Sequence, residues 1–480
     1  MPDFLRQLKQ VCKHVISDRD RLKIYESDGL VTRKAVPRFV ALPETVAEVQ
    51  DTVRLCHDHR IPVVARGAGT SLSGGAMPHE EGVLLSLAKF TRILEIDKDN
   101  LLAYVEPGVT NLAISQSVRS LGLYYAPDPS SQIACTIGGN VAENAGGVHC
   151  LKYGLTVHNV RQLKIVAPDG QLYVIGSTGF DSAGFDLLAL MHGSEGMLGI
   201  VVEVAVCLLP MPDDIVVVIA GFETVTKASE TVADIIAEGL IPAGLEMMDK
   251  LAIRAAEDFV NVGYPTDVDS LLLCELDGSA DEVEQQLLQL NRILDTHDAL
   301  HVRIARDEQS RSELWRGRKA AFPAVGRIAP DYFCMDGTIP KKELSTVLNH
   351  ISDLSEEYGL AVANVFHAGD GNLHPLIMYD SNVPGDLEKA EELGARILES
   401  CLQKGGTITG EHGVGVEKID QMCLQFSTEE LNLFHGIKAV FDDRGILNPG
   451  KAIPTLNRCA EFGAMHVHRG EEKFPDLERF

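Results

Sequence analysis

The sequence has ten cysteines, but no two of them are spaced for a local metal cluster. No Cys-x-x-Cys occurs, and the nearest two cysteines, Cys135 and Cys150, lie fifteen positions apart. This spacing excludes a zinc ribbon or a ferredoxin-type cluster formed by neighbouring cysteines of this chain. Scattered cysteines in an acidic chain of 480 residues predict reduced thiols in the cytosol.

The sequence also lacks the apolar segments of secreted and membrane proteins. Residues 1–6 read MPDFLR and contain no apolar core of a signal peptide. The longest strongly apolar run, residues 215–221, is far too short to cross a bilayer. We therefore expect no transmembrane segment and a cytoplasmic location.

Positive charge is scarce. The chain has 43 Lys and Arg against 69 Asp and Glu, which gives a formal net charge of −26. A field of that sign repels nucleic acids and anionic membranes at long range, so we predict no nucleic-acid partner. A small anionic substrate would need a locally positive site.

The composition, with 45% hydrophobic and 23% charged residues, is typical of a globular chain, and the length predicts two to four domains. An α/β alternation begins near residue 37, and the segment LPMPDD at residues 209–214 interrupts it. We predict an N-terminal helical segment at 1–36 and domains at 37–213 and 214–445. A C-terminal segment at 446–480 should return to the first domain. The second domain is predicted as α+β, with one antiparallel sheet that carries helices on one face.

A glycine-rich segment, RGAGTSLSGG at residues 66–75, follows a predicted strand. Its glycines let backbone amides approach a ligand, while Thr70 and Ser71 add hydroxyls and Arg66 adds charge. This chemistry suits a diphosphate, although a plain glycine-rich loop remains the alternative. The segment is neither a Walker loop nor a Rossmann fingerprint, because the required Lys-Ser/Thr and GxGxxG patterns are missing.

Further clusters follow in order: DPSS at 128–131, TIGGN at 136–140, NAGG at 144–147 and GSEGMLGI at 193–200. Each alone is consistent with a turn. Glycine inside a regular element costs roughly 0.5–1 kcal/mol relative to alanine, so this density indicates a function. A long ligand that the backbone contacts along its length would account for it.

In this order the clusters resemble the FAD-binding domain of the vanillyl-alcohol oxidase / p-cresol methylhydroxylase flavoprotein family. The resemblance implies a two-part FAD-binding domain at 37–213, with the FAD pyrophosphate on residues 67–71. The loop at 66–75 has no His or Cys for a covalent link, so non-covalent FAD is expected. The cofactor contacts implied are Arg66, Gly67, Ala68, Gly69, Thr70, Ser71, Gly74, Pro107, Ser131, Thr136, Gly138, Gly139, Asn144, Glu195, Ile200 and Asn448.

A histidine pair occurs in the segment VFHAGDGNLHP at residues 365–375. If Asp370-Gly371 forms a two-residue hairpin turn, residues whose numbers sum to 741 lie opposite each other, as His367 and His374 do. Their Cβ atoms would then lie roughly 4.5–5.5 Å apart, close enough to share one metal ion. Two unrelated histidines in a polar hairpin are the alternative.

A third metal ligand is offered by the loop TGEHGVG at residues 409–415. Adjacent side chains on extended backbone point in opposite directions, so we assign Glu411 to the metal and His412 to the substrate as a base. A His, His, Glu set suits Zn²⁺ first, with Mn²⁺ and Fe²⁺ as alternatives. Arg318, on a predicted helix, could offer its planar fork to a substrate carboxylate, whereas we expect Arg316 to be solvated.

The segments HAGDGNLHP and GEHGVG together resemble the C-terminal substrate (cap) domain of the FAD-linked 2-hydroxyacid dehydrogenases. The resemblance implies that His367, His374 and Glu411 bind metal, His412 is the base, and Arg318 and Asn372 contact or support the substrate. Phe322 and Cys334 stand where hydroxyglutarate-oxidising members carry threonine and lysine. A small substrate is therefore implied.

The implied function is FAD-dependent oxidation of a small 2-hydroxy acid, with hydride transfer to the flavin. Glycolate is the first candidate and D-lactate the alternative. The resemblance, which spans nearly the whole chain, also implies a second FAD-binding subunit and an iron–sulfur subunit, on the cytoplasmic face of the inner membrane. Two other classes are alternatives: a catalytically silent FAD-binding scaffold, and a colourless metallohydrolase with a structural nucleotide.

Overall fold

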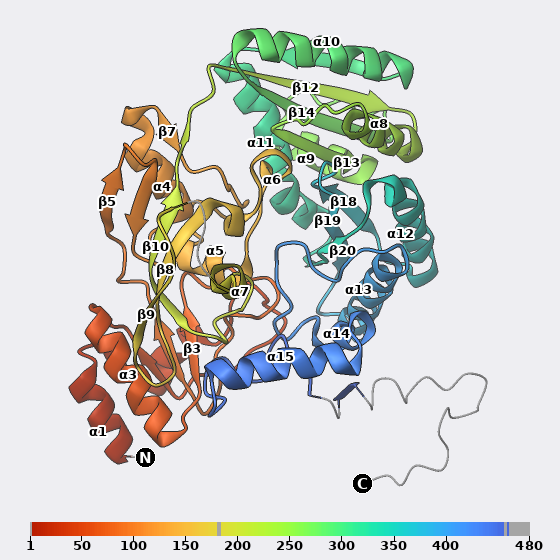
Figure 1. Cartoon of the computed structure of the whole chain (residues 1–480). Coiled ribbons are helices and arrows are strands. Elements are labelled where there is room, and N and C mark those ends of the chain that lie inside the picture. Colours follow the sequence, from red (N-terminus) through yellow and green to blue (C-terminus); the bar gives the residue numbers. More distant parts are fainter. Residues whose placement is uncertain (1, 180–183, 456–457, 460–480) are drawn as a thin grey trace.

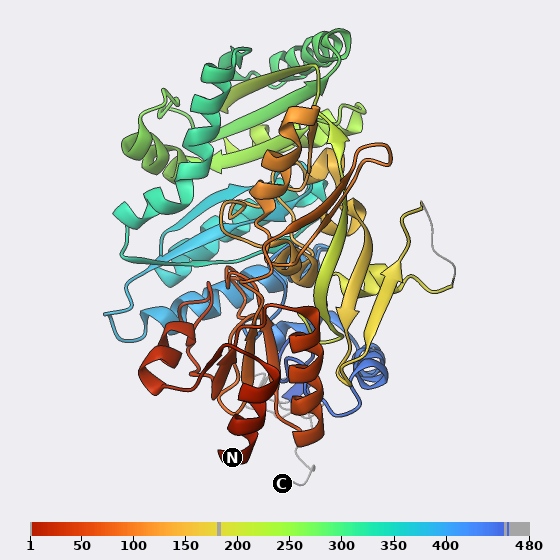
Figure 2. The ribbon, with the colours of Figure 1, turned by 90° about the vertical axis from the view of Figure 1, so that its left-hand side faces the viewer.

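The structure, a computed structural model, describes residues 2–179, 184–455 and 458–459. Two sheet-bearing parts lie beside each other, and helix α15 (Thr428–Phe441) runs along the base of both (Figure 1). The view turned by 90° shows the green strands of the second part at the opposite end from the red N-terminal helices (Figure 2). None of the helices within the described ranges combines the length and apolar character needed to cross a membrane.

The first part contains two main sheets, as the resemblance implied. One has the order β1-β2-β4-β3, with its last three strands parallel, and the other is antiparallel with the order β5-β6-β10-β8-β9. The strands are β1 (Val15–Ile16), β2 (Phe39–Ala41), β3 (Val63–Arg66), β4 (Val83–Ser86), β5 (Ile93–Asp97), β6 (Leu102–Val105), β8 (Val160–Val166), β9 (Leu172–Gly176) and β10 (Ile200–Cys207). A short pair, β7 (Leu123–Tyr124) with β11 (Leu209–Pro210), lies beside them.

The helices of this part are α1 (Pro2–Val11), α2 (Arg19–Leu22), α3 (Val46–His59), α4 (Asn111–Val118), α5 (Ile137–Glu143), α6 (Cys150–Tyr153) and α7 (Leu187–Met191). Helix α3 begins where Thr45 accepts a hydrogen bond from the Glu48 amide, which satisfies one of the amides that lack a partner within the helix. The Asp169-Gly170 step lies in the hairpin between β8 and β9, with Gly170 at φ +80°. After α15 the chain returns to this part, where Leu447 pairs with Val63 of β3.

The second part contains one antiparallel sheet with the order β15-β12-β14-β13-β18-β20-β16. The strands are β12 (Asp214–Phe222), β13 (Gly244–Asp249), β14 (Ser270–Gly278), β15 (Leu300–Ala305), β16 (Asp331–Cys334), β18 (Val362–Phe366) and β20 (Pro375–Tyr379), with β17 (Gly337–Thr338) pairing with β19 (Asn372–Leu373). The helices are α8 (Val225–Ala237), α9 (Lys250–Val260), α10 (Ala280–Thr296), α11 (Glu308–Ala324), α12 (Leu344–Tyr358), α13 (Asp386–Gln403) and α14 (Ile419–Gln425). Short 3₁₀ turns occupy Lys23–Tyr25, Arg119–Leu121, Thr156–Asn159, Val325–Arg327 and Lys341–Glu343.

The prediction that helices cover only one face of this sheet is wrong. Val216 and Val218 of β12 pack into a core with α8, α10, α12 and α13, whereas Val217 and Ile219 face α9 and α11. The physical reason is visible in β12 itself, which is apolar at successive positions. A strand that is apolar on both faces must be covered on both.

The predicted register of the histidine hairpin is also wrong. Asn364 pairs with Pro375 and His367 bridges Asn372, so paired residues sum to 739 instead of 741. The loop therefore contains four residues, 368–371, rather than the two-residue turn that Asp370-Gly371 suggested. A shift of two positions keeps every side chain on its face, because the side-chain period of a strand is two. His367 and His374 thus remain on one face as diagonal neighbours.

The prediction that all thiols are reduced is wrong for one pair. Cys423 of α14 and Cys459 form a disulfide, while the other eight cysteines are free. The two residues are 36 positions apart, and only the return of the chain past α14 brings them together.

Candidate active site

The glycine-rich segment at 66–75 forms a loop that leaves β3 and passes the start of α5. A Cβ atom on Gly67 would lie 2.1 Å from the Thr136 hydroxyl oxygen, and one on Gly138 would lie 2.6 Å from the Pro107 side chain. Gly69 has φ +75°, a conformation that L side chains rarely adopt. A side chain is therefore excluded at Gly67 of the loop and at Gly138 of α5, and one at Gly69 would be strained, so the loop backbone can pass close to the start of α5.

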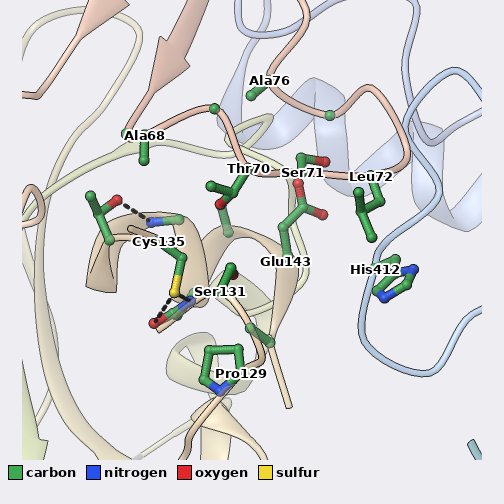
Figure 3. Close-up of a pocket in the computed structure, with 18 of the residues that line it drawn as sticks. Ala68, Thr70, Ser71, Leu72, Ala76, Pro129, Ser131, Cys135, Glu143 and His412 are labelled. Carbon is green, nitrogen blue, oxygen red and sulfur yellow. Dashed lines mark hydrogen bonds between the residues drawn. The ribbon is translucent and has the colours of Figure 1, made fainter. Parts of the chain in front are cut away.

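That space is a cavity of about 440 Å³ between the two parts of the molecule. Most of the residues predicted to hold the cofactor line it, and Figure 3 shows Ala68, Thr70 and Ser71 on the loop above Ser131 and Cys135. The predicted residues in the lining are Arg66, Gly67, Ala68, Gly69, Thr70, Ser71, Pro107, Ser131, Thr136, Gly138, Gly139, Glu195 and Ile200. This extended cradle of small residues fits a long cofactor such as FAD.

Three predicted cofactor contacts lie behind the wall of the cavity instead. Gly74 has φ +82° and packs against Val416. Asn144 ends helix α5 in the left-handed conformation and accepts a hydrogen bond from the Val157 amide. Asn448 donates hydrogen bonds to backbone carbonyl oxygens of the two glycine-rich loops. All three support the loops, which explains their glycine-like backbone and their place in the motifs.

Arg66 lines the cavity, but its guanidinium also holds the N-terminal segment. Its Nη1 donates to the Tyr25 carbonyl oxygen at 3.0 Å, and its Nη2 donates to the Ser27 carbonyl oxygen. A Cβ on Gly69 would lie 2.4 Å from Nη2, so the guanidinium packs directly against the loop. Arg66 therefore supports the cradle as well as contributing charge to it.

The three predicted metal ligands converge at the other end of the cavity. His367 Nε2 and His374 Nε2 each lie 3.3 Å from Glu411 Oε1. Both histidines are buried, and neither Nε2 atom has a hydrogen-bond partner within the described residues. Two ligands about 2.0–2.1 Å from a tetrahedral metal lie roughly 3.3–3.4 Å apart. The orphaned nitrogens and their spacing therefore fit a divalent cation.

Glu246, which the sequence reasoning missed, connects this cluster to the predicted substrate arginine. Its Oε1 lies 2.6 Å from His367 Nδ1, and its Oε2 accepts a hydrogen bond from Arg318 Nε at 2.8 Å and forms an ion pair with Nη2 at 2.6 Å. A carboxylate on the far nitrogen fixes a metal-binding histidine in orientation and tautomer. Burial raises the pKa of Glu246, but the charges of His367 and Arg318 outweigh it and hold that pKa below its usual range.

A sequence signal for Glu246 existed, since an acid within the buried strand GLEMMD needs a charged partner. Its contacts change the expectation for Arg318. Glu246 binds the edge of the Arg318 guanidinium formed by Nε and Nη2. The edge formed by the two Nη atoms is therefore the one that a substrate carboxylate could meet.

Asp336 is the second residue that sequence reasoning missed, and it organises the loop that carries Glu411 and His412. Its carboxylate is fully buried, and burial is outweighed by the Lys418 charge, so the Asp336 pKa lies well below its usual range. Its hydrogen-bond donors are Asn372 Nδ2 at 2.7 Å, Thr409 Oγ1 at 2.6 Å, the amides of Gly410, Glu411 and His412, and Lys418 Nζ at 3.1 Å. Asn372 therefore supports Asp336, and it does not line the cavity.

His412, the predicted base, lies beside the predicted metal ligands. Its ring stacks on that of His374 with centroids 4.8 Å apart, and it lines the cavity. Its Nδ1 is buried without a hydrogen-bond partner in the described part of the chain. Burial lowers the pKa of His412 to about 4, so the imidazole is neutral near pH 7 and able to accept a proton.

The wall beside this cluster comes from α11 and β16. Arg318, Lys319, Phe322 and Tyr332 line the cavity, and the Phe322 ring stands 6.4 Å from that of His374. The thiol of Cys334 instead donates to the Met335 carbonyl oxygen and lies outside the lining. The expectation that Cys334 shapes the pocket is thus not supported by its position, whereas Phe322 does form the wall.

Comparisons with known proteins match both parts of the chain to families. Residues 37–176 match an FAD binding domain, and residues 211–452 match the C-terminal domain of FAD linked oxidases. The chain is 59% identical to the glycolate oxidase subunit GlcD of Escherichia coli (strain K12), over 95% of this chain and 91% of the relative. It is 31% identical to a D-lactate dehydrogenase of Anaerostipes hadrus, over 94% of this chain and 97% of the relative.

Among solved structures, p-cresol methylhydroxylase has the same fold. Its TM-score is 0.80 at 17% identity, and the match covers 95% of this chain and 97% of that chain. The two-domain fold implied by the glycine clusters is thereby confirmed.

Proposed function

This chain belongs to the FAD-linked oxidases, and we propose that it oxidises a small 2-hydroxy acid, glycolate in the first place, at the His412 end of its cavity. The observation that carries the proposal is one continuous cavity that joins the FAD cradle to the cluster of His367, His374 and Glu411. A cofactor in the cradle and a substrate at the cluster would share that space. FAD, when bound, supplies the acceptor for the hydride from C2 of the substrate.

The metal site rests on this chain's own donors. His367, His374 and Glu411 would hold the ion, Glu246 would orient His367, and Zn²⁺ suits this set, with Mn²⁺ and Fe²⁺ as alternatives. Such an ion supplies a Lewis acid that lowers the pKa of a bound hydroxyl.

Proton removal is the part assigned to His412. The ring is neutral, buried and stacked on His374, so it faces the same space as the metal ligands. A base that is neutral at the working pH can take the hydroxyl proton while the C2 hydride departs. Asp336 holds the His412 amide at 2.9 Å, which fixes the loop and thereby the position of the ring.

The substrate wall favours a small acid with one carboxylate. The free edge of Arg318 is the donor set for that carboxylate, and the Phe322 ring occupies space beside His374. An unpaired second carboxylate against this wall would cost on the order of several kcal/mol. D-lactate, which adds one methyl group to glycolate, is the second candidate, and the name of the Anaerostipes hadrus relative supports it.

Partner subunits are part of the proposal. The Escherichia coli relative is named as a subunit of a glycolate oxidase, which supports a multi-subunit assembly for this chain. The chain's cysteine spacing provides no local iron–sulfur motif, so electrons would leave to another protein or to a quinone. We propose a second FAD-binding subunit and an iron–sulfur subunit as these partners, in the cytoplasm at the inner membrane.

The test is reduction of the bound flavin without oxygen. Purified holoprotein should be yellow, and glycolate or D-lactate should bleach it. D-2-hydroxyglutarate should be slower by at least about a hundredfold in kcat/KM, which corresponds to about 2.7 kcal/mol. The variant Phe322→Thr should narrow that ratio, while Cys334→Ser, outside the cavity, should leave it unchanged.

Two results would contradict the proposal. Yellow protein that none of the three acids bleaches would favour the catalytically silent scaffold. Equal rates for all three acids would mean that another cation, such as Lys319 on the same wall, binds the second carboxylate.

A further inference from the structure

A half-buried acid that the proposed chemistry does not use lines the cavity. Glu143 is the last residue of α5, and its carboxyl projects between the loop residue Ser71 and the His412 loop (Figure 3). A Cβ on Gly75 would lie 2.5 Å from its Oε1, and a Cβ on Gly413 would lie 2.2 Å from its Oε2. Two glycines from the two parts of the molecule therefore leave room for this carboxyl.

The neighbour of Glu143 is a buried acid, Glu195, and the two are not equivalent. Glu195 Oε1 accepts a hydrogen bond from the Val414 amide at 2.7 Å, and its Oε2 accepts one from the Gly415 amide at 2.9 Å. Glu143 Oε2 is buried and has no partner among the residues that the structure describes. Burial raises the pKa of Glu195 too, but its hydrogen bonds from the two amides oppose that rise, so Glu195 is favoured over Glu143 to carry the negative charge.

The surroundings then favour a proton on Glu143. Burial and the Glu195 charge raise the pKa of Glu143 well above its usual range. Lys451 is the nearby cation, but its ammonium donates to the Gly75 carbonyl oxygen at 3.1 Å and to Asn448 Oδ1 at 2.7 Å. It supports the loops from behind. Two like charges in one dry site are costly, and one proton removes that cost.

We propose that Glu143 is a neutral carboxylic acid that donates a hydrogen bond to an acceptor atom of the flavin ring, and that it positions the ring beside His412. A protonated carboxyl has one O–H donor, and Glu143 lines the same cavity as His374 and His412 of the proposed substrate end. The flavin ring must lie at that end to meet the substrate. The proposal rests on FAD binding alone and is independent of which acid is oxidised.

The test uses the holoprotein without substrate. Glu143→Gln keeps a neutral donor of the same shape. Its FAD affinity should therefore stay within about threefold of the wild-type value, and its visible spectrum should not change. Glu143→Leu removes the donor and should weaken FAD binding about tenfold, the loss expected for one buried hydrogen bond. The matched control is Glu417→Leu, which removes a second acid of raised pKa outside the cavity lining and should leave FAD affinity unchanged.

The midpoint potential of the flavin gives a readout that needs only the Gln variant. A neutral acid predicts the same potential for wild type and Glu143→Gln from pH 6 to pH 8. A more positive potential in the variant would show that an ionised carboxylate was removed, and would overturn the proposal. Equal FAD affinity and equal spectra for the Leu and Gln variants would also overturn the proposal, because the Glu143 side chain would then act only by packing and not as a hydrogen-bond donor.

Discussion

The two ends of the cavity are built by opposite means: the proposed FAD cradle at residues 66–71, called the cofactor end, and the cluster of proposed metal ligands His367, His374 and Glu411, called the metal end. At the cofactor end, glycines and small hydroxyl residues line the cavity, and a single Cβ on Gly67 would collide with Thr136. At the metal end, buried charged side chains hold one another, and Glu246 joins His367 to Arg318. The first design tolerates changes of side-chain chemistry but no added volume. The second tolerates little change of chemistry, because each buried charge depends on its partner.

The largest expected effect is at the metal end. His367→Ala should remove the metal and lower kcat/KM by at least about a thousandfold, or about 4 kcal/mol, while FAD stays bound. Metal analysis and the visible spectrum of the variant decide this. His350→Ala, on helix α12 away from the cavity, is the control. Full metal occupancy in the His367→Ala variant would show that His367 is not a metal ligand, and the proposed metal site would be wrong.

The second effect breaks the cofactor end. Gly69→Ala places a methyl group on a residue with φ +75° and within 2.4 Å of Arg66, so FAD affinity should fall about a hundredfold. Gly122→Ala is a matched control, because Gly122 has φ +71° and open space around its Cβ position. Titration of the apoprotein with FAD measures both. Equal losses in the two variants would mean that backbone strain, rather than loop geometry, causes the effect.

The third effect sharpens the contrast by changing charge without changing shape. Glu246→Gln should weaken metal binding by about thirtyfold, because His367 and Arg318 lose the carboxylate that orients them. FAD affinity should not change. Metal titration of the chelated protein gives the value. If the variant binds metal as tightly as the wild type, Glu246 orients Arg318 and has no role in positioning His367 for the metal.

The smallest effect concerns the contact that joins the two regions. His149 lies between Asp128, at 2.9 Å, and Glu275, at 3.0 Å, and so links the first part of the molecule to β14 of the second. Burial lowers the pKa of His149, but the two carboxylates outweigh it and raise that pKa well above its usual value. This contribution to stability is therefore complete below about pH 6.5 and is lost as the pH rises through the raised pKa.

Wild type should lose on the order of 1–2 kcal/mol of unfolding free energy across that alkaline range through this contact, and His149→Gln should lack that dependence. Urea unfolding at a series of pH values from 6 to 9 measures both proteins. His301→Gln, whose histidine forms an exposed pair with Asp267, is the control and should behave as the wild type. The same slope in the His149 variant and the wild type would assign the pH dependence to other groups.

The two regions also differ in how far the sequence predicts them. Local sequence patterns predict the glycine cradle, because glycines allow the backbone conformations that such a loop needs. Residues 66–71 line the cavity as expected. At the metal end, His367 and His374 were placed on one face for a reason that was partly wrong. The loop has four residues instead of two, and only the period of two in strands preserved the conclusion.

The sequence did not predict which residues contact each other across long distances in the chain. Asp336 organises the His412 loop from 76 positions away, and Glu246 contacts His367 from 121 positions away. Residues so far apart in the sequence form no local motif from which their contact could be predicted. The disulfide between Cys423 and Cys459 is missed for the same reason, since scattered cysteines carry no pairing information.

By itself the sequence indicated the glycine-rich cradle and the identity of the three candidate metal ligands. These depend on residue type and on neighbours within a few positions. The tertiary structure alone decided which buried charges hold each other, that helices cover both faces of the seven-stranded sheet, and that Glu143 and Glu195 share one dry site. The physical reason is that burial and the pairing of charges are properties of space, and they arise only when distant segments pack together.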